Sequence, residues 1–113
     1  MSSAVLIGID IGTSSTKSVV LSIDGETLAT ATQSYPVDTP RPGWAEQSPA
    51  CWVDAVQQTV RAAVDTAGVS PSSVAGIGLS GQMHGTVCVS ADGHPLRPAI
   101  IWADQRTSQE VAE

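Results

Sequence analysis

The chain has 113 residues, of which 42% are hydrophobic, and 11 acidic against five basic side chains give a net charge of −6 at pH 7. This length allows one domain with a modest core, and the negative charge argues against a protein that binds nucleic-acid phosphates. No basic segment followed by a long apolar run opens the sequence, so we expect neither a signal peptide nor a membrane span. Cys51 and Cys88 lack zinc-type spacing and are expected to be reduced thiols of a cytoplasmic protein.

The first third of the chain is predicted to be a three-stranded antiparallel meander. Val5–Ile11 is rich in β-branched residues, as expected of a strand buried on both faces. Gly12–Ser15 is a small polar turn. The strands Lys17–Ile23 and Glu26–Gln33 follow, joined by the hairpin signal Asp24-Gly25.

The middle of the chain is predicted to be a loop and one amphipathic helix. Three prolines and a glycine make Tyr35–Ser48 a loop. Ser48 suits the N-cap, Pro49 the first helical position and Gly68 the end of the helix. A core-facing stripe is expected from apolar residues at helical spacing, namely Trp52, Val56, Val60, Ala63 and Val64.

The last third is expected to return to strands. Val74–Leu79 and Thr86–Val89 are predicted strands, Asp92-Gly93 marks a hairpin, Pro95–Trp102 is extended, and a helix is expected from Asp104 onward. The predicted order is therefore β-β-β-α-β plus a hairpin, in an α/β domain with a mixed sheet.

Asp10, the carboxylate in the first apolar run, raises two alternatives. Either the strand ends there and the side chain caps the following turn, or the carboxylate serves a ligand. In the second case Gly12, Thr13 and Ser14 offer clustered N–H and O–H donors to an anion. Asp10 then holds Mg²⁺, through water, against a phosphate, and Lys17 adds a positive charge.

Two common phosphate-binding patterns do not explain this turn. The pattern GxxxxGK[ST] does not occur in the sequence, which excludes a P-loop. Gly76–Gly81 does read GxGxxG, but its glycines fall within an expected strand and no helix follows. We therefore reject a dinucleotide site.

A second polar cluster is Gly81–Gly85, which reads Gly-Gln-Met-His-Gly. The flanking glycines allow a ligand to approach the backbone closely. In an extended segment Gln82 and His84 would project from one face and Met83 from the other. Glutamine and histidine both donate and accept hydrogen bonds, which suits a ligand with hydroxyl groups. A structural role for His84 and core packing of Met83 are the alternatives.

Four segments, taken together, resemble the FGGY family of carbohydrate kinases, which belongs to the actin-like ATPase superfamily. They occur in the family's order over essentially the whole chain: Ile7–Ser14 followed by Lys17, Trp44–Gln47, Gly81–Gly85 and Arg97–Arg106. The resemblance implies the N-terminal part of a ribonuclease-H-like domain.

The resemblance also implies roles for individual positions. Asp10 would organise magnesium and the transferred phosphate, and Gly12–Ser14, with Lys17 nearby, would face the γ-phosphate of ATP. Met83 and His84 would contact the sugar, with Gln82 beside them.

Near the sugar pocket, Asp104 and Arg106 match a family pattern, whereas Trp44 and Trp102 are expected only to pack. The implied activity is phosphorylation of a small-molecule sugar by ATP with Mg²⁺, and the Gln-Met-His-Gly form of the motif favours D-xylulose. The alternatives are a kinase for ribulose, gluconate or another polyol, and a non-catalytic actin-like module that binds nucleotide.

Residues 1–113 would correspond to the N-terminal portion of the family's first, sugar-binding domain. The rest of that domain, the catalytic base and the nucleotide-binding domain would lie outside these residues, and the 113 residues alone are not expected to turn over. We expect a cytoplasmic protein without nucleic-acid or membrane partners, and a homodimer of the full-length protein is an open alternative.

Overall fold

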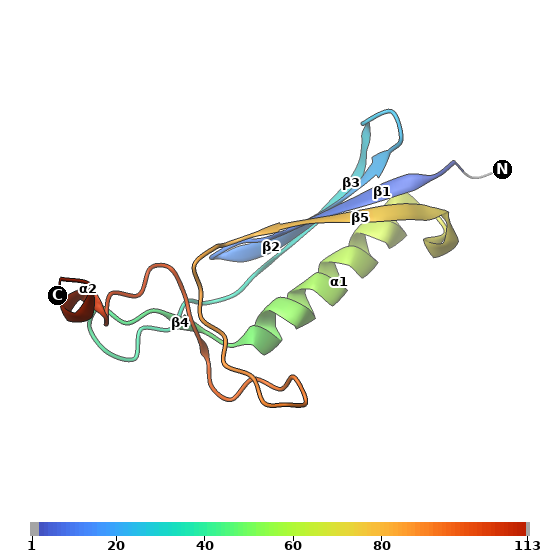
Figure 1. Cartoon of the computed structure of the whole chain (residues 1–113). Coiled ribbons are helices and arrows are strands. Elements are labelled where there is room, and N and C mark those ends of the chain that lie inside the picture. The colour runs from blue at the N-terminus through green and yellow to red at the C-terminus, as the bar shows by residue number, and fades with distance from the viewer. Residues whose placement is uncertain (1–2, 113) are drawn as a thin grey trace.

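The computed structural model describes residues 3–112, and its main feature is a four-stranded mixed sheet (Figure 1). The strands lie in the order β3-β2-β1-β5, with β1 at Val5–Ile11, β2 at Ser15–Ser22, β3 at Thr27–Ser34 and β5 at Val74–Gly81. The pairs β1–β2 and β2–β3 are antiparallel, whereas β1 and β5 are parallel. The predicted meander and the mixed sheet are confirmed.

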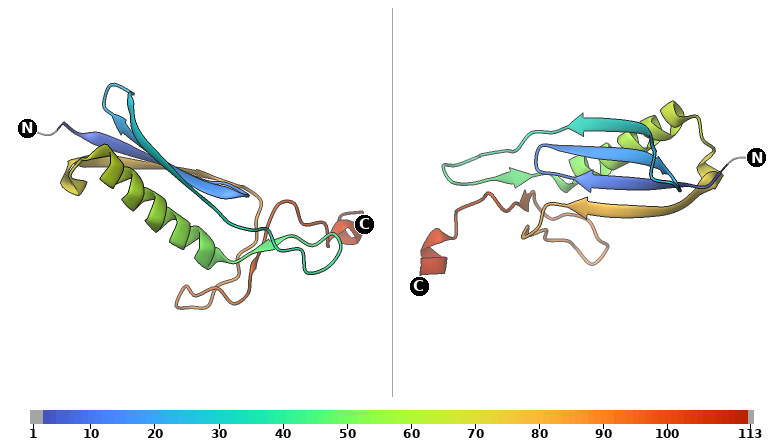
Figure 2. Two further views of the ribbon diagram at one scale, coloured as in Figure 1. Left: turned by 180° about the vertical axis from the view of Figure 1, so that it is seen from behind. Right: turned by 90° about the horizontal axis from the view of Figure 1, so that it is seen from above.

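Helix α1, Pro49–Ala67, runs along one face of this sheet (Figure 2). It begins after Ser48 and ends at Gly68, which has a φ of 68° and donates its N–H to the carbonyls of Val64 and Asp65. A left-handed residue at this position is accommodated by glycine without strain. Both predicted helix boundaries are confirmed, although the Ser48 side chain makes no capping hydrogen bond.

The buried face of α1 differs from the predicted stripe. Its fully buried residues are Ala55, Thr59 and Ala63, because small side chains allow the helix to lie close over β2 and β3. At the point of closest approach the Thr59 and Ser18 hydroxyls form a hydrogen bond of 2.7 Å. Of the predicted stripe only Ala63 is fully buried, and Trp52, Val56, Val60 and Val64 lie half-buried on its flank.

Beyond the end of the sheet, a small second unit is formed by residues far apart in sequence. Strand β4, Glu46–Gln47, pairs antiparallel with β6, Ala99–Ile100, and the short helix α2, Ser108–Ala112, follows. The 3₁₀ turn η1, Pro71–Ser73, connects α1 to β5. Among the described residues, no helix combines the length and apolarity needed to cross a bilayer.

Two predictions for the last third are corrected. Thr86–Val89 is not a strand, since only Thr86 and Val89 form single bridges, to Ile100 and Pro95. The predicted hairpin turn is present nevertheless, with Gly93 at a φ of 84° and its N–H donated to the Ser90 carbonyl. The last helix starts at Ser108 rather than Asp104.

Candidate functional site

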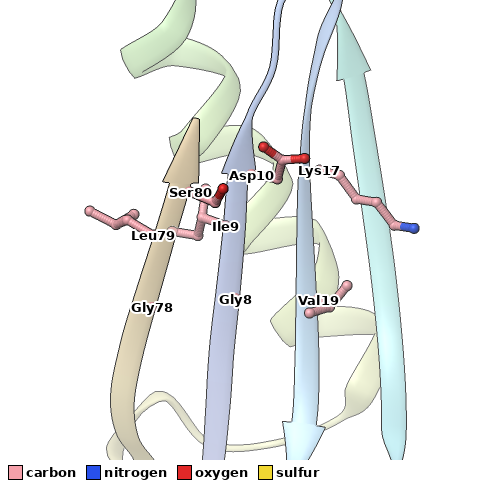
Figure 3. A pocket seen from close by; sticks show the side chains of 8 residues that line it. All are labelled: Gly8, Ile9, Asp10, Lys17, Val19, Gly78, Leu79 and Ser80. Atoms are coloured by element: carbon pink, nitrogen blue, oxygen red, sulfur yellow. The ribbon is translucent and has the colours of Figure 1, made fainter. Parts of the chain in front are cut away.

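Asp10 lies on the face of the sheet opposite α1, where no helix covers it (Figure 3). It is opposite Lys17 on β2 and beside Ser80 on β5 in the strand register. These residues line a shallow hollow of about 430 Å³. No described residue donates a hydrogen bond to the Asp10 carboxylate. The alternative in which this side chain caps the turn is therefore wrong. The carboxylate is exposed and has its oxygens available for a ligand.

The turn after Asp10 is fixed by bonds to its carbonyl oxygens. Tyr35 donates its hydroxyl to the Gly12 carbonyl at 2.6 Å and its N–H to the Ser14 carbonyl at 3.0 Å. The Gly12 N–H is donated to the Ser15 carbonyl at 2.9 Å. A Cβ at Gly12 would lie 3.0 Å from that same carbonyl oxygen, so only glycine fits without a shift.

The carbonyl of Thr13, in the middle of this turn, also accepts a hydrogen bond. Gln47 Nε2 donates to the Thr13 carbonyl at 2.5 Å. The carbonyls of Gly12, Thr13 and Ser14 are therefore all engaged inside the protein, while no described residue accepts a hydrogen bond from the N–H of Thr13 or Ser14. A turn with engaged carbonyls and free N–H groups is suited to an anion.

Gln47 was not predicted as a site residue, and its side chain is fully buried. Its Nε2 donates to Thr13 and to the Pro36 carbonyl at 3.3 Å. Its Oε1 accepts from Trp52 Nε1 at 3.0 Å and from Gln82 Nε2 at 2.9 Å. All four hydrogen-bonding positions of the amide are thus filled.

The segment Gln82–Gly85 leaves β5 at the same end of the sheet as the turn. Ile11 and Gly81 are partners in the parallel pair, and the Gln82 N–H continues the pairing to the Ile11 carbonyl at 3.1 Å. The carboxyl ends of β1 and β5 therefore place the turn and this segment side by side. Such crevices at the carboxyl ends of parallel strands are where open α/β sheets bind ligands.

The predicted alternation of side chains in this segment is not found, because residues 82–85 are not extended. His84 has a φ of 64°, unusual for a residue other than glycine, and lines a hollow of about 340 Å³ with Gln82 and Trp52. Met83 is 73% exposed, which excludes core packing within these residues. Gln82 points its amide to Gln47 instead of leaving it free.

Trp102 is not a packing residue, contrary to the prediction. Its side chain is 57% exposed, and its Nε1 donates to Thr13 Oγ1 at 2.8 Å. Trp44 does pack, with its ring 3.7 Å from the Arg106 guanidinium carbon and 5.1 Å from that of Arg41.

Asp104 and Arg106 belong to a cluster of paired charges around Glu46. Arg106 Nε donates to both Asp104 oxygens at 2.9 Å, and its NH2 group donates to Glu46 at 2.6 Å. Arg97 pairs with the same Glu46 oxygen. The bond from Arg106, with the Ala45 N–H at 2.7 Å as a further donor, lowers the pKa of Asp104 to about 2. Arg106 likewise lowers the pKa of Glu46.

These features define a class: a mixed α/β sheet whose first hairpin forms a turn with N–H groups that no described residue accepts, beside an exposed carboxylate, with a polar segment at the neighbouring strand end. Residues 5–113 match the model of the FGGY family of carbohydrate kinases, N-terminal domain. The chain belongs to this family, and the expected fold is confirmed.

Xylulose kinases are prominent among the relatives. The chain is 39% identical to the xylulose kinase of Staphylococcus xylosus over 97% of its length and 41% identical to that of Escherichia coli K12 over 92%. The gluconate kinase of Lactobacillus acidophilus superposes with a TM-score of 0.90 at 32% identity, over 98% of the chain and 22% of that structure. The chain spans about one fifth, 22% and 21%, of the two xylulose kinases.

Proposed function

We propose that this protein transfers the γ-phosphate of ATP to D-xylulose, giving D-xylulose 5-phosphate and ADP. Family membership supports a sugar kinase, and the named xylulose kinases support this acceptor. The observation that carries the proposal is the turn at Gly12–Ser14 beside Asp10, whose carbonyls are engaged and whose Thr13 and Ser14 N–H groups are accepted by no described residue.

In this proposal the turn binds the γ-phosphate. The N–H groups of Thr13 and Ser14 donate to its oxygens, and Lys17, the cross-strand neighbour of Asp10, adds a positive charge. Because phosphoryl transfer depends on positioning and charge neutralisation, a rigid turn of this kind is well matched to it.

A magnesium ion fits the same place. Asp10 is a single exposed carboxylate to which no described residue donates a hydrogen bond, and Mg²⁺ is commonly held by one or two carboxylates together with water and phosphate oxygens. Among residues 3–112, no group of three or more metal-binding side chains exists, so a site made of protein ligands alone is not expected. When bound, the ion neutralises charge on the phosphate oxygens; Asp10 would hold it through water.

The sugar is assigned to the segment that follows β5. Met83 and His84 are exposed and follow Gln82, which lies beside Thr13 of the turn, so they are available to a polyhydroxylated ligand. Asp104 and Arg106 already satisfy each other's charges. We assign them to holding the chain around Trp102 in place at the edge of the sugar site.

The base that removes the proton from the sugar hydroxyl is placed outside these residues, as is the nucleotide-binding domain. Residues 1–113 then form the N-terminal portion of the sugar-binding domain. The protein would work in the cytoplasm on small molecules, without nucleic acid or membrane.

The test is ADP formation by the product of the complete reading frame, with D-xylulose, D-ribulose, gluconate and glycerol compared at equal concentration and with Mg²⁺ present. We expect the highest kcat/KM with D-xylulose. Preference for gluconate, which the similarity to a gluconate kinase makes the second candidate, would overturn the acceptor. Nucleotide binding without transfer to any acceptor would identify a non-catalytic module instead.

A further inference from the structure

We propose that Gln47 is a positioning residue that holds the turn Gly12–Ser14 (the phosphate turn) and the segment Gln82–Gly85 (the sugar segment) in one fixed relation. The expected effect on the reaction rate rests on the proposed function. The structural basis is the four hydrogen bonds of the Gln47 amide. Gln47 touches neither reactant in this scheme. It acts through Thr13 on one side and through Gln82 on the other.

The orientation of the Gln47 amide is unambiguous. Trp52 Nε1 is a donor only, so the atom that it contacts at 3.0 Å must be the amide oxygen. The carbonyls of Thr13 and Pro36 are acceptors only, so the atom facing them must be the NH₂ group. A flip of the amide, which would swap its oxygen and its nitrogen, would place donors against donors and acceptors against acceptors.

Burial makes this arrangement rigid. The Gln47 side chain has no exposed surface, and a buried polar group that loses its partner has no water to replace it. The amide thus favours one position of the Thr13 carbonyl, and with it the direction of the neighbouring N–H groups that face the anion.

The same amide also reaches the sugar segment. Gln82 Nε2 donates to Gln47 Oε1 at 2.9 Å, and Gln82 Oε1 lies 3.5 Å from Thr13 Oγ1. Thr13, Gln47 and Gln82 therefore form a closed polar triangle between the carboxyl ends of β1 and β5. A displacement of either segment would therefore strain the hydrogen bonds of this triangle and displace the other segment.

The sharpest variant is Gln47→Met, which keeps the length and the neutrality of the side chain but removes the NH₂ donor that faces Thr13 and Pro36 together with the acceptor for Trp52 and Gln82. In the complete protein we expect kcat to fall about tenfold or more, because small displacements of positioned reactants are costly in rate. The matched control is Thr59→Val, which removes a buried hydrogen bond of 2.7 Å to Ser18 and leaves the Gln47 contacts unaltered.

A merely structural role predicts a different pattern. Both variants would then lower the melting temperature and leave kcat within about twofold of the wild type. The proposal requires that Gln47→Met lose kcat even when its melting temperature is no lower than that of Thr59→Val, which keeps its kcat. Equal kcat in the two variants overturns it.

Two further measurements keep the test decisive. If Gln47→Met does not fold, Trp52→Phe removes the donor to Gln47 Oε1 together with part of the ring, and it must lower kcat at least threefold; a smaller change overturns the proposal. The assay uses whichever sugar the wild type phosphorylates best, so a wrong acceptor refutes the proposed function without touching this inference. If the wild type phosphorylates none, Mg-ATP affinity replaces kcat, with the same tenfold criterion.

Discussion

Replacing Tyr35 with phenylalanine tests how the turn Gly12–Ser14 is fixed, because it removes a single oxygen atom. The hydroxyl has one proton, which goes to the Gly12 carbonyl at 2.6 Å, so Thr16 Oγ1, 3.0 Å away, must donate to it. Tyr35 is 8% exposed and Thr16 is fully buried. Hydrogen bonds of this kind contribute about 1 kcal/mol each, and buried groups left unpaired cost about 1–3 kcal/mol. We expect Tyr35→Phe to lower the free energy of unfolding by about 2 kcal/mol.

The measurement is urea unfolding of the complete protein, wild type against Tyr35→Phe, Thr16→Val and the double variant. Tyr35 is the only described acceptor for the Thr16 hydroxyl. The double variant therefore leaves only the Gly12 carbonyl without its partner, and its effect should fall short of the sum of the single effects by about 1 kcal/mol. Strict additivity, or a single effect below about 0.5 kcal/mol, would refute the reasoning.

Three other outcomes follow from the structure. Asp10→Asn should abolish most of the proposed kinase activity and leave the melting temperature unchanged, since no described residue bonds to this exposed carboxylate; a large loss of stability would contradict its assignment to a ligand. Gly81→Ala should destabilise the protein, because the new Cβ would lie 3.0 Å from the Ile11 carbonyl oxygen, and Ala substituted at Gly78, where a Cβ meets nothing within 4 Å, is the matched control. Because the pKa of Asp104 is lowered, from 3.8 to about 2, its paired form stabilises the folded state above pH 3.8 and this contribution is lost as the pH falls toward 2. Acid unfolding of Asp104→Asn should therefore be shallower than that of the wild type across this window, and identical slopes would contradict the pairing.

The parts of the fold that the sequence predicts are those specified by neighbours along the chain. The hairpin at Asp24-Gly25 needs only a residue that tolerates positive φ, and Gly25 has a φ of 89°. The ends of α1 follow from Pro49 and Gly68 in the same way. Local chemistry of this kind is readable without knowing what lies across the molecule.

Contacts between distant residues explain what the sequence does not reveal. Thr86–Val89 has β-branched residues typical of a strand, but it meets Ile100 only through Thr86, so a strand has no partner to form along. Trp102 reads as a core residue, and its role depends on Thr13, 89 positions earlier in the chain. Hydropathy alone carries no signal for such a hydrogen bond.

Strand β4 shows why the two polar residues Glu46 and Gln47 differ. Successive side chains of a strand point to opposite sides, and here Gln47 reaches the phosphate turn while Glu46 reaches Arg97 and Arg106. A carboxylate at position 47 would place a negative charge beside a site proposed to bind a polyanion, whereas the neutral amide supplies donors without that repulsion. The charged member of the pair faces the arginines, where its charge is compensated. The order Glu-Gln, rather than Gln-Glu, is therefore the one that fits the proposed anion site on this side of β4.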